Sequence, residues 1–169
     1  NQTSNIDDFK DLDCVFLSLP HGSSNEYVKK LIDKVKIIDL SADYRIDDMN
    51  SYKKYYKSSF DPDIQNKFHY GFIENNLENI QKSSNIANPG CFALASQLAV
   101  LPFHELIDTI SITAITGSSG GGKLPTSKNH HSIRSKDIFS YNVNKHRHLA
   151  EIFQTFPNLK NNLSFVPLS

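Results

Sequence analysis

The first part of the chain alternates short apolar runs with one amphipathic segment. The apolar run from Val15 to Leu19 ends at Pro20, and its length is typical of a buried parallel strand. Ser23 and Glu26 have the spacing of a capping box, and the apolar positions that follow recur at helical intervals. A second apolar run starts at Val35. This order predicts a parallel βαβ unit, whose ligands gather at the carboxyl ends of the strands.

The middle of the chain has a weaker pattern. Residues 49–79 are rich in Tyr, Lys, Asn and Asp, which predicts short helices and loops. Residues 85–87 are expected to form a short strand. Apolar positions from Cys91 to Leu101 then predict a helix that stops before Pro102.

The last part changes character, which indicates a domain boundary near Cys91. Residues 110–116 alternate polar and apolar side chains, as in a half-buried strand of antiparallel type whose polar face meets solvent or a partner. Residues 117–145 form a long stretch with Gly, Ser and His, and loops of such length are usually functional or mobile. Residues 149–156 predict a helix and residues 163–168 a closing strand.

Composition narrows the class of protein. The chain has 169 residues, 38% of them hydrophobic, with 18 basic and 18 acidic side chains. A chain of this size buries a core but holds one domain or parts of two. Because the net charge is zero and the basic residues are dispersed, no nucleic-acid partner is expected. No apolar run is long enough for a membrane span, and no signal peptide is recognisable, so a cytoplasmic location is expected.

The two cysteines differ in their surroundings. Cys91 follows Pro89-Gly90 and opens a predicted helix, where unpaired N–H groups and the helix dipole favour a thiolate. A buried core cysteine explains the same spacing equally well. Cys14 lies within an apolar run and is assigned to the core. A reducing compartment gives no reason to pair them.

A second polar cluster near the C-terminus offers proton transfer and a fixed cation. It consists of His146, Arg147, His148 and Glu151. A nucleophilic thiol needs a proton-transfer partner, and an anionic substrate needs a cation. The alternatives are a metal site in which His130, His131 or Glu151 completes the His-x-His pair, for which the ligand spacing is poor, and a solvated polar turn.

Three loop segments carry weaker signals. Gly117 to Lys123 resembles a phosphate-wrapping loop, but Leu124 breaks the Walker pattern, and a flexible connector fits the composition too. Asp43 and Arg45 follow the second strand and are either ligand contacts or a salt-bridged loop pair. His21 and Gly22 either meet a cofactor or form a turn.

Taken together, the chain resembles the N-acetyl-gamma-glutamyl-phosphate reductase family, the arginine-pathway relatives of aspartate-semialdehyde dehydrogenase. The resemblance rests on FLSLPHGSS from Phe16, IIDLSADYRI from Ile37, HYGFIE from His69, IANPGCFALASQLAVLP from Ile86, TGSSGGGK from Thr116 and HRHLAEI from His146. Each motif is weak alone, but their order along the chain is specific. The loop GSSGGGK departs from the family, which often has an alanine and an arginine there.

The resemblance implies a fold and two domains. The fold class is α/β, with a partial doubly wound nucleotide-binding domain followed by part of an α+β substrate and dimerisation domain. Residues 1–90 would belong to the NADP-binding domain and residues 91–169 to the catalytic domain. A homo-oligomer that uses the sheet around residues 110–116 is implied as well.

The resemblance also implies the chemistry. Cys91 would attack an acyl phosphate and expel phosphate, NADPH would reduce the thioester, and a histidine would move the proton that releases the aldehyde. His148 is favoured as that histidine and His146 is second. Contacts to the cofactor are implied for Ser18, Pro20, His21, Gly22, Ser119, Gly120 and Gly121. Contacts to the substrate are implied for Tyr70, Gly71, Glu74, Asn88, Arg147 and Glu151.

Competing functions remain open at the level of sequence. A reductase of a related acyl phosphate (aspartyl, N-succinylglutamyl or aminoadipyl phosphate) would use the same thioester chemistry. A cysteine hydrolase would use water in place of hydride. The chain starts at Asn1 and its single methionine is Met49, so it is expected to be a fragment, and a non-catalytic truncated module is the third reading.

The chain alone is expected to bind NADP weakly or not at all. The family's first strand and its glycine-rich turn, which cradle the pyrophosphate, are expected to precede residue 1. Isothermal titration calorimetry measures this directly. Binding in the micromolar range would contradict the expectation.

Overall fold

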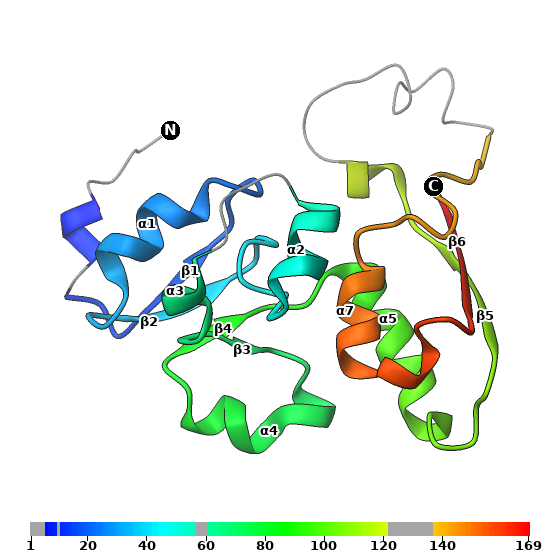
Figure 1. Cartoon of the computed structure of the whole chain (residues 1–169). Coiled ribbons are helices and arrows are strands. Elements are labelled where there is room, and N and C mark those ends of the chain that lie inside the picture. The colour runs from blue at the N-terminus through cyan, green and yellow to red at the C-terminus, as the bar shows by residue number, and fades with distance from the viewer. Residues whose placement is uncertain (1–5, 10, 57–60, 122–136) are drawn as a thin grey trace.

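The computed structural model describes residues 6–9, 11–56, 61–121 and 137–169. Along the chain the elements are η1 (Ile6–Phe9), β1 (Cys14–Leu17), α1 (Ser24–Leu31), β2 (Lys36–Asp39), α2 (Met49–Tyr55), α3 (Pro62–Gln65), β3 (His69–Tyr70), α4 (Ile73–Lys82), β4 (Asn85–Ala87), α5 (Cys91–Val100), η2 (Leu101–Phe103), β5 (Ile110–Ile115), η3 (Ser118–Gly121), α7 (Leu149–Thr155), η4 (Pro157–Leu159) and β6 (Leu163–Leu168). Helices surround a sheet in the first half, and α5 and α7 lie between that sheet and the β5–β6 pair (Figure 1).

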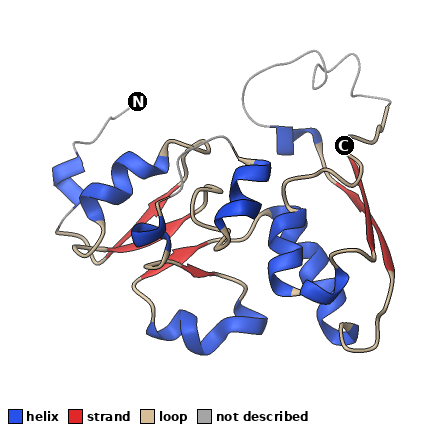
Figure 2. Ribbon diagram, viewed as in Figure 1, coloured by secondary structure: helices blue, strands red, loops and turns tan. Residues whose placement is uncertain are grey.

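The first half is built on a four-stranded parallel sheet in the order β1-β2-β4-β3. The pairing of β1 with β2 across α1 confirms the predicted βαβ unit. The strand predicted over residues 85–87 is β4, which lies between β2 and β3. Figure 2 shows the strands with helices around them. The fold class α/β is therefore confirmed.

One face of the sheet carries the main core. Val28 and Leu31 of α1 pack on Val15, Leu17 and Ile37 of the strands below. The other face of β1 is open, because Phe16 is 67% exposed. The predicted parallel strand is therefore present, but only one of its faces is buried. An edge strand with only one covered face alternates buried and exposed side chains, as β1 does.

The start of α1 is stabilised by a distant carboxylate and not by a capping box. The Ser23 side chain makes no cap hydrogen bond. Instead Asp43 accepts hydrogen bonds from the backbone N–H of Gly22 at 2.7 Å and of Ser24 at 3.2 Å. Gly22 has φ +87°, in the left-handed region that glycine adopts without strain. The predicted capping box is therefore wrong, because the acceptor at the start of α1 comes from the loop after β2.

The weakly patterned middle segment forms α2, α3 and α4, as predicted, but it also contains β3. This two-residue strand was not predicted because His69 and Tyr70 show no strand pattern of their own. Its pairing with β4 places Tyr70 beside Ala87. Tyr70 therefore reaches the carboxyl end of the sheet, where the polar network described below begins.

The second half pairs α5 and α7 with two strands. Helix α5 buries residues Phe92, Ala93, Ser96, Gln97 and Val100, and it ends before Pro102, as predicted. The polar positions of β5 are exposed, which confirms its alternation. However, β5 and β6 are parallel, and the expectation of an antiparallel strand is wrong. The chain returns through α7 between the two strands, and such a crossover brings them into parallel alignment.

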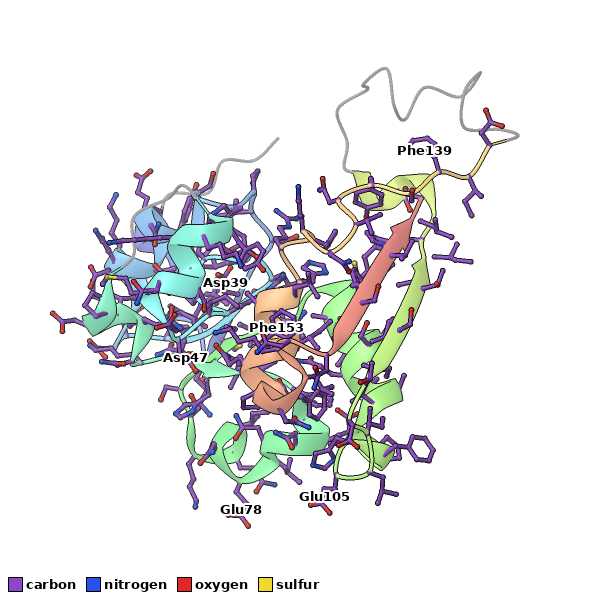
Figure 3. All side chains as sticks on the ribbon, turned by 45° about the vertical axis from the view of Figure 1, so that its right-hand side comes forward. Asp39, Asp47, Glu78, Glu105, Phe139 and Phe153 are labelled. Atoms are coloured by element: carbon purple, nitrogen blue, oxygen red, sulfur yellow. The ribbon has the colours of Figure 1, made fainter. Side chains whose placement is uncertain are left out.

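Charged side chains divide between the surface and the sheet end. Glu78 and Glu105 project from the periphery, whereas Asp39 lies inside (Figure 3). Asp39 accepts hydrogen bonds from the hydroxyls of Ser24 and Ser41, which compensates for its burial. None of the helices in the described ranges is long and apolar enough to cross a membrane.

Replacing the distant cap is expected to cost more stability than replacing the local serine. Asp43→Ala removes the acceptor for two N–H groups and for His21, and should lower the free energy of unfolding by about 2 kcal/mol. Ser23→Ala should change it by less than about 0.5 kcal/mol. Urea unfolding of both variants measures the difference. A larger loss of stability in Ser23→Ala than in Asp43→Ala would show that the capping box stabilises the start of α1.

Candidate functional site

The turn from Asn88 to Cys91 leads from the carboxyl end of β4 into α5. Cys91 is exposed and is the first residue of α5, with Gly90 as the N-cap residue. Free N–H groups at a helix start and the positive end of its dipole favour an anion there. The core alternative for Cys91 does not apply, since the side chain reaches solvent. Cys14 is half-buried and unpaired, so neither cysteine forms a disulfide.

His148 lies against this turn from the other half of the chain. It is buried and is the N-cap residue of α7. A Cβ on Gly90 would stand only 2.4 Å from His148 Nε2 and 2.8 Å from Arg45 Nη1. Glycine is therefore required at position 90, because only a residue without a side chain lets the imidazole approach the backbone beside Cys91.

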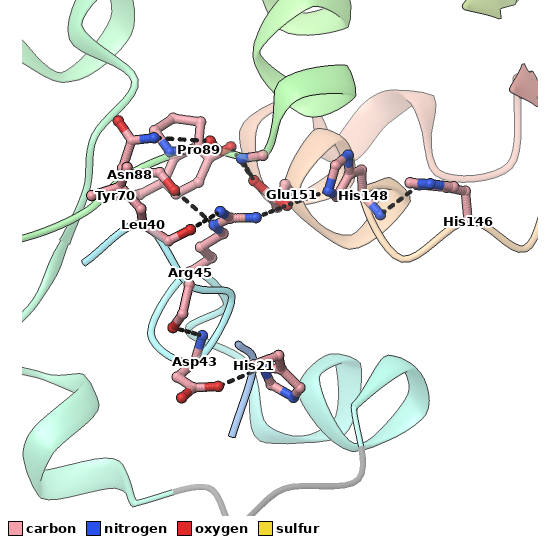
Figure 4. A network of polar contacts seen from close by, with 12 residues as sticks. His21, Leu40, Asp43, Arg45, Tyr70, Asn88, Pro89, His146, His148 and Glu151 are labelled. Carbon is pink, nitrogen blue, oxygen red and sulfur yellow. Dashed lines mark hydrogen bonds and ion pairs between the residues drawn. The ribbon is translucent and has the colours of Figure 1, made fainter. Parts of the chain in front are cut away.

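His146 lies further from the turn than His148 does (Figure 4). Its Nδ1 accepts the backbone N–H of His148 at 3.2 Å, which assigns the remaining proton to Nε2 when the ring is neutral. Its ring packs edge to face on Phe92 and Tyr141. In Figure 4 His146 stands beyond His148 as seen from Glu151. Within the described residues, the buried Nδ1 of His148 has no hydrogen-bond partner.

Glu151 joins the two halves of the site. It is fully buried, and its Oε2 accepts from the Gly90 N–H at 2.8 Å and from the Tyr70 hydroxyl at 2.8 Å. Its Oε1 lies 3.5 Å from Arg45 Nη1 and 3.9 Å from His148 Nε2. Figure 4 shows this carboxylate between Pro89, Arg45 and His148. From the sequence, Glu151 is expected to contact substrate. In the structure its carboxylate is buried and hydrogen-bonded to protein groups.

Arg45 is the buried cation of this network. Its Nε donates to the Asn88 carbonyl at 2.7 Å and its Nη2 to the Leu40 carbonyl at 2.8 Å. Arg45 is therefore paired with Glu151, and Asp43 with His21, so the loop pair considered from sequence does not form. The loop after β2 thus contacts two elements: Arg45 pairs with Glu151 of α7, and Asp43 pairs with His21 at the end of β1.

Burial shifts the protonation of the site. Burial is the main cause that lowers the pKa of His148 to about 3, and Arg45 and Arg147 contribute to this shift. Burial is also the main cause that lowers the pKa of His146 to about 4, with a contribution from Arg147. Both imidazoles are therefore neutral at pH 7. Burial raises the pKa of Glu151, and Arg45 is the largest of the influences that oppose this rise.

The end of β1 presents the residues expected to meet a cofactor. Ser18 and Pro20 are exposed, and His21 is half-buried. The His21 Nδ1 lies 2.5 Å from Asp43 Oδ1, and its ring packs 4.4 Å from that of Tyr56. His21 is thus held in one orientation at the sheet edge where ligands of parallel sheets bind.

The remaining expected residues fall into two groups. Near the network, Tyr70 points inward, Gly71 donates its N–H to the Ala87 carbonyl at 2.9 Å, and Asn88 is exposed. Exposed side chains are also found at Glu74, in the first turn of α4, and at Arg147. Ser119, Gly120 and Gly121 belong to η3, which follows β5. Gly122, Lys123, Leu124, His130 and His131 lie outside the described residues.

Two contributors were missed or misread from sequence. Gln97 is fully buried in α5 and donates to the Glu151 carbonyl at 3.0 Å. A polar residue on the buried stripe of an apolar helix is the signal that identifies it. Arg45 could be located near the strand end but not paired, because its partner lies 106 residues away. Among described residues, no group of three His, Cys, Asp or Glu side chains is gathered as a metal site requires.

Comparison with known proteins finds reductases among the proteins to which the chain is similar. It is 42% identical over 168 residues to N-acetyl-gamma-glutamyl-phosphate reductase of Ehrlichia canis, covering 95% of this chain and 49% of that protein. It is 38% identical to a LysW-linked aminoadipate or glutamate phosphate reductase of Thermococcus kodakarensis, over 85% of this chain and 43% of that protein. The chain thus spans about half the length of the curated relatives it matches.

The fold and the family models agree. Aspartate semialdehyde dehydrogenase II of Vibrio cholerae superposes with a TM-score of 0.66 at 16% identity, over 94% of this chain and 52% of that one, which shows a shared fold. The model for the semialdehyde dehydrogenase NAD binding domain matches residues 1–83, and that for the semialdehyde dehydrogenase dimerisation domain matches residues 91–169. The resemblance found in the motifs is confirmed, and the chain belongs to the semialdehyde dehydrogenase family.

Proposed function

We propose that this chain carries the catalytic turn of an NADPH-dependent reductase that converts N-acetyl-gamma-glutamyl phosphate to N-acetylglutamate 5-semialdehyde, in arginine biosynthesis. The observation that carries the proposal is an exposed Cys91 at the start of α5, next to a glycine against which His148 Nε2 is packed. A nucleophile beside a base, with helix N–H groups around it, is the arrangement that acyl transfer requires. The name of the Ehrlichia canis relative supports this substrate.

Residues 1–90 would serve the cofactor and residues 91–169 the substrate. The match to an NAD binding domain supports a nicotinamide cofactor. The residues at the end of β1 fit the nicotinamide end of such a cofactor: Ser18 offers an exposed hydroxyl, Gly22 a backbone without side chain, and Asp43 holds the His21 ring. When bound, NADPH supplies the hydride that reduces the thioester on Cys91.

The Cys91 sulfur performs the first step. As a thiolate it attacks the acyl carbon, so that a C–S bond forms, the C–O bond to phosphate breaks and inorganic phosphate leaves. The start of α5 supplies N–H groups to the negative charge that develops on the carbonyl oxygen. The exposed guanidinium of Arg147 is suited to the anionic substrate.

His148 handles the proton. Because its imidazole is neutral at pH 7, it can accept the proton of the Cys91 thiol and then give that proton to the oxyanion that hydride reduction of the thioester leaves. It accepts the proton back from the resulting thiohemiacetal hydroxyl as the C–S bond breaks, which releases the aldehyde and regenerates the thiolate. His146 is the weaker candidate, since its Nδ1 already accepts from the chain.

The surroundings of the turn supply the remaining roles. Asn88 and Glu74 are exposed and would contact substrate from β4 and α4. Tyr70, Gly71 and Glu151 are bonded within the protein and would shape the pocket from behind. Ser119, Gly120 and Gly121 would approach the cofactor from the end of β5.

A reductase of a LysW-linked aminoadipyl or glutamyl phosphate is the second candidate, because the Thermococcus kodakarensis relative carries that name. The thioester chemistry is the same, and only the contacts to the acyl group differ. The whole protein is proposed to act as a cytoplasmic homo-oligomer, supported by the match to a dimerisation domain and by the exposed face of β5.

Without NADPH, the chain is expected to release about one equivalent of phosphate from N-acetyl-gamma-glutamyl phosphate and then stop, because the thioester awaits hydride. Acid quenching and mass spectrometry should show the acyl group on Cys91. A cysteine hydrolase would instead release many equivalents. Cys91→Ser should abolish the burst and Cys14→Ser should retain it; a burst that survives Cys91→Ser would exclude the proposal.

The neutral state of His148 gives a stability signature. Its folded-state pKa of about 3 lies below the unfolded value, so the unfolded chain takes up the proton first as the pH falls. Stability is therefore complete above about pH 7 and is lost below, by about 2 kcal/mol from this residue between pH 7 and pH 5. His148→Gln should lose correspondingly less over that interval in urea unfolding. Equal losses would show that the imidazole is not buried in neutral form.

A further inference from the structure

The guanidinium of Arg45 contacts three segments of the candidate site. It donates to the Leu40 carbonyl after β2 and to the Asn88 carbonyl after β4, and it lies 3.5 Å from the Glu151 carboxylate on α7. Arg45 is itself buried. A planar group with several donors in a fixed fork holds three acceptors in one geometry, which a lysine cannot reproduce.

Glu151 depends on this cation. A fully buried carboxylate is costly unless it is paired and hydrogen-bonded. Its other close contacts, the Gly90 N–H and the Tyr70 hydroxyl, are neutral donors. Without Arg45 the carboxylate would take up a proton or move, and the bond to the Gly90 N–H would weaken.

The turn before Cys91 is thus held from both sides. Arg45 fixes the carbonyl of Asn88, and Glu151 fixes the N–H of Gly90 two residues later. The same carboxylate lies 3.9 Å from His148 Nε2. The directions of the Cys91 side chain and of the His148 ring therefore rest on one buried ion pair.

A different contact docks the loop that carries Arg45. Gln154 accepts the N–H of Asp47 at 2.9 Å and donates to the carbonyl of Arg45 at 3.1 Å. These bonds do not involve the guanidinium. Replacing the Arg45 side chain should therefore leave the loop attached to α7, so that the effect on the turn can be measured in a folded chain.

We infer that Arg45 is a positioning residue: through Asn88 and Glu151 it sets the turn that presents Cys91 to the substrate and to His148. Arg45 lies behind the turn, and its contribution is to the rate of thioester formation and not to substrate binding. This inference rests on the proposed function as far as the acyl transfer is concerned. The geometry of the thiol can be tested without it.

The first measurement is the single-turnover release of phosphate by Arg45→Met. At saturating acyl phosphate the rate should fall about 100-fold, while the substrate concentration for half-maximal rate changes less than about threefold. Arg45→Lys keeps the charge and should be intermediate. The double variant R45M/E151Q should release phosphate faster than R45M, because it leaves no unpaired carboxylate. Lys30→Met, which removes an exposed cation of α1, is the control and should match the unmodified chain.

The second measurement is alkylation of Cys91 by iodoacetamide at pH 7 in a Cys14→Ser background. Arg45→Met should slow it about tenfold, because the turn no longer directs N–H groups at the sulfur. A folded R45M chain with unchanged alkylation and unchanged phosphate release would overturn the inference. If the circular dichroism of R45M is not native, R45K decides: slower alkylation supports the inference and the unmodified rate overturns it.

The two measurements separate the two proposals. If the unmodified chain releases no more phosphate than Cys91→Ser, the proposed acyl transfer fails, and the alkylation rates still decide on Arg45. If the burst occurs and R45M retains it in full with unchanged alkylation, only the role of Arg45 fails.

Discussion

The candidate site depends on one carboxylate without access to solvent. Glu151 brings a negative charge into the interior between the parallel sheet and α5, and this charge is tolerated because Arg45, the Gly90 N–H and the Tyr70 hydroxyl surround it. Each partner comes from a different segment. The energetic requirement of the carboxylate thereby becomes a geometric one, because the ends of β2, β3 and β4 must converge on α7 for the charge to be satisfied.

This convergence places the reactive groups. The strands of the sheet are parallel, so their carboxyl ends meet at one edge, and β4 runs directly into the turn and α5. Helix α7 lies against α5, and His148 is its N-cap residue. The thiol thus comes from the end of the sheet and the imidazole from the start of α7. Gly90 lets the imidazole approach the turn, since any side chain there would overlap the imidazole.

Burial also sets the protonation states of the two buried histidines. His146 and His148 are neutral because they are enclosed among aromatic rings and near Arg45 and Arg147. A neutral imidazole can accept a proton, which is the role proposed for His148.

The sequence by itself determined most of the elements and singled out the candidate site residues. Apolar periodicity predicted β1, α1, β2, β4, α5, α7 and β6, and the motifs around Cys91 and His148 indicated the family, because local propensity and residue identity are properties of adjacent positions. The tertiary structure alone decided the partners: Asp43 and not Ser23 caps α1, Arg45 pairs with Glu151, β5 and β6 are parallel, and β3 exists because Tyr70 pairs beside Ala87. These contacts join positions far apart in the chain. Their formation depends on burial and on the direction of the connecting segments, which no local pattern records.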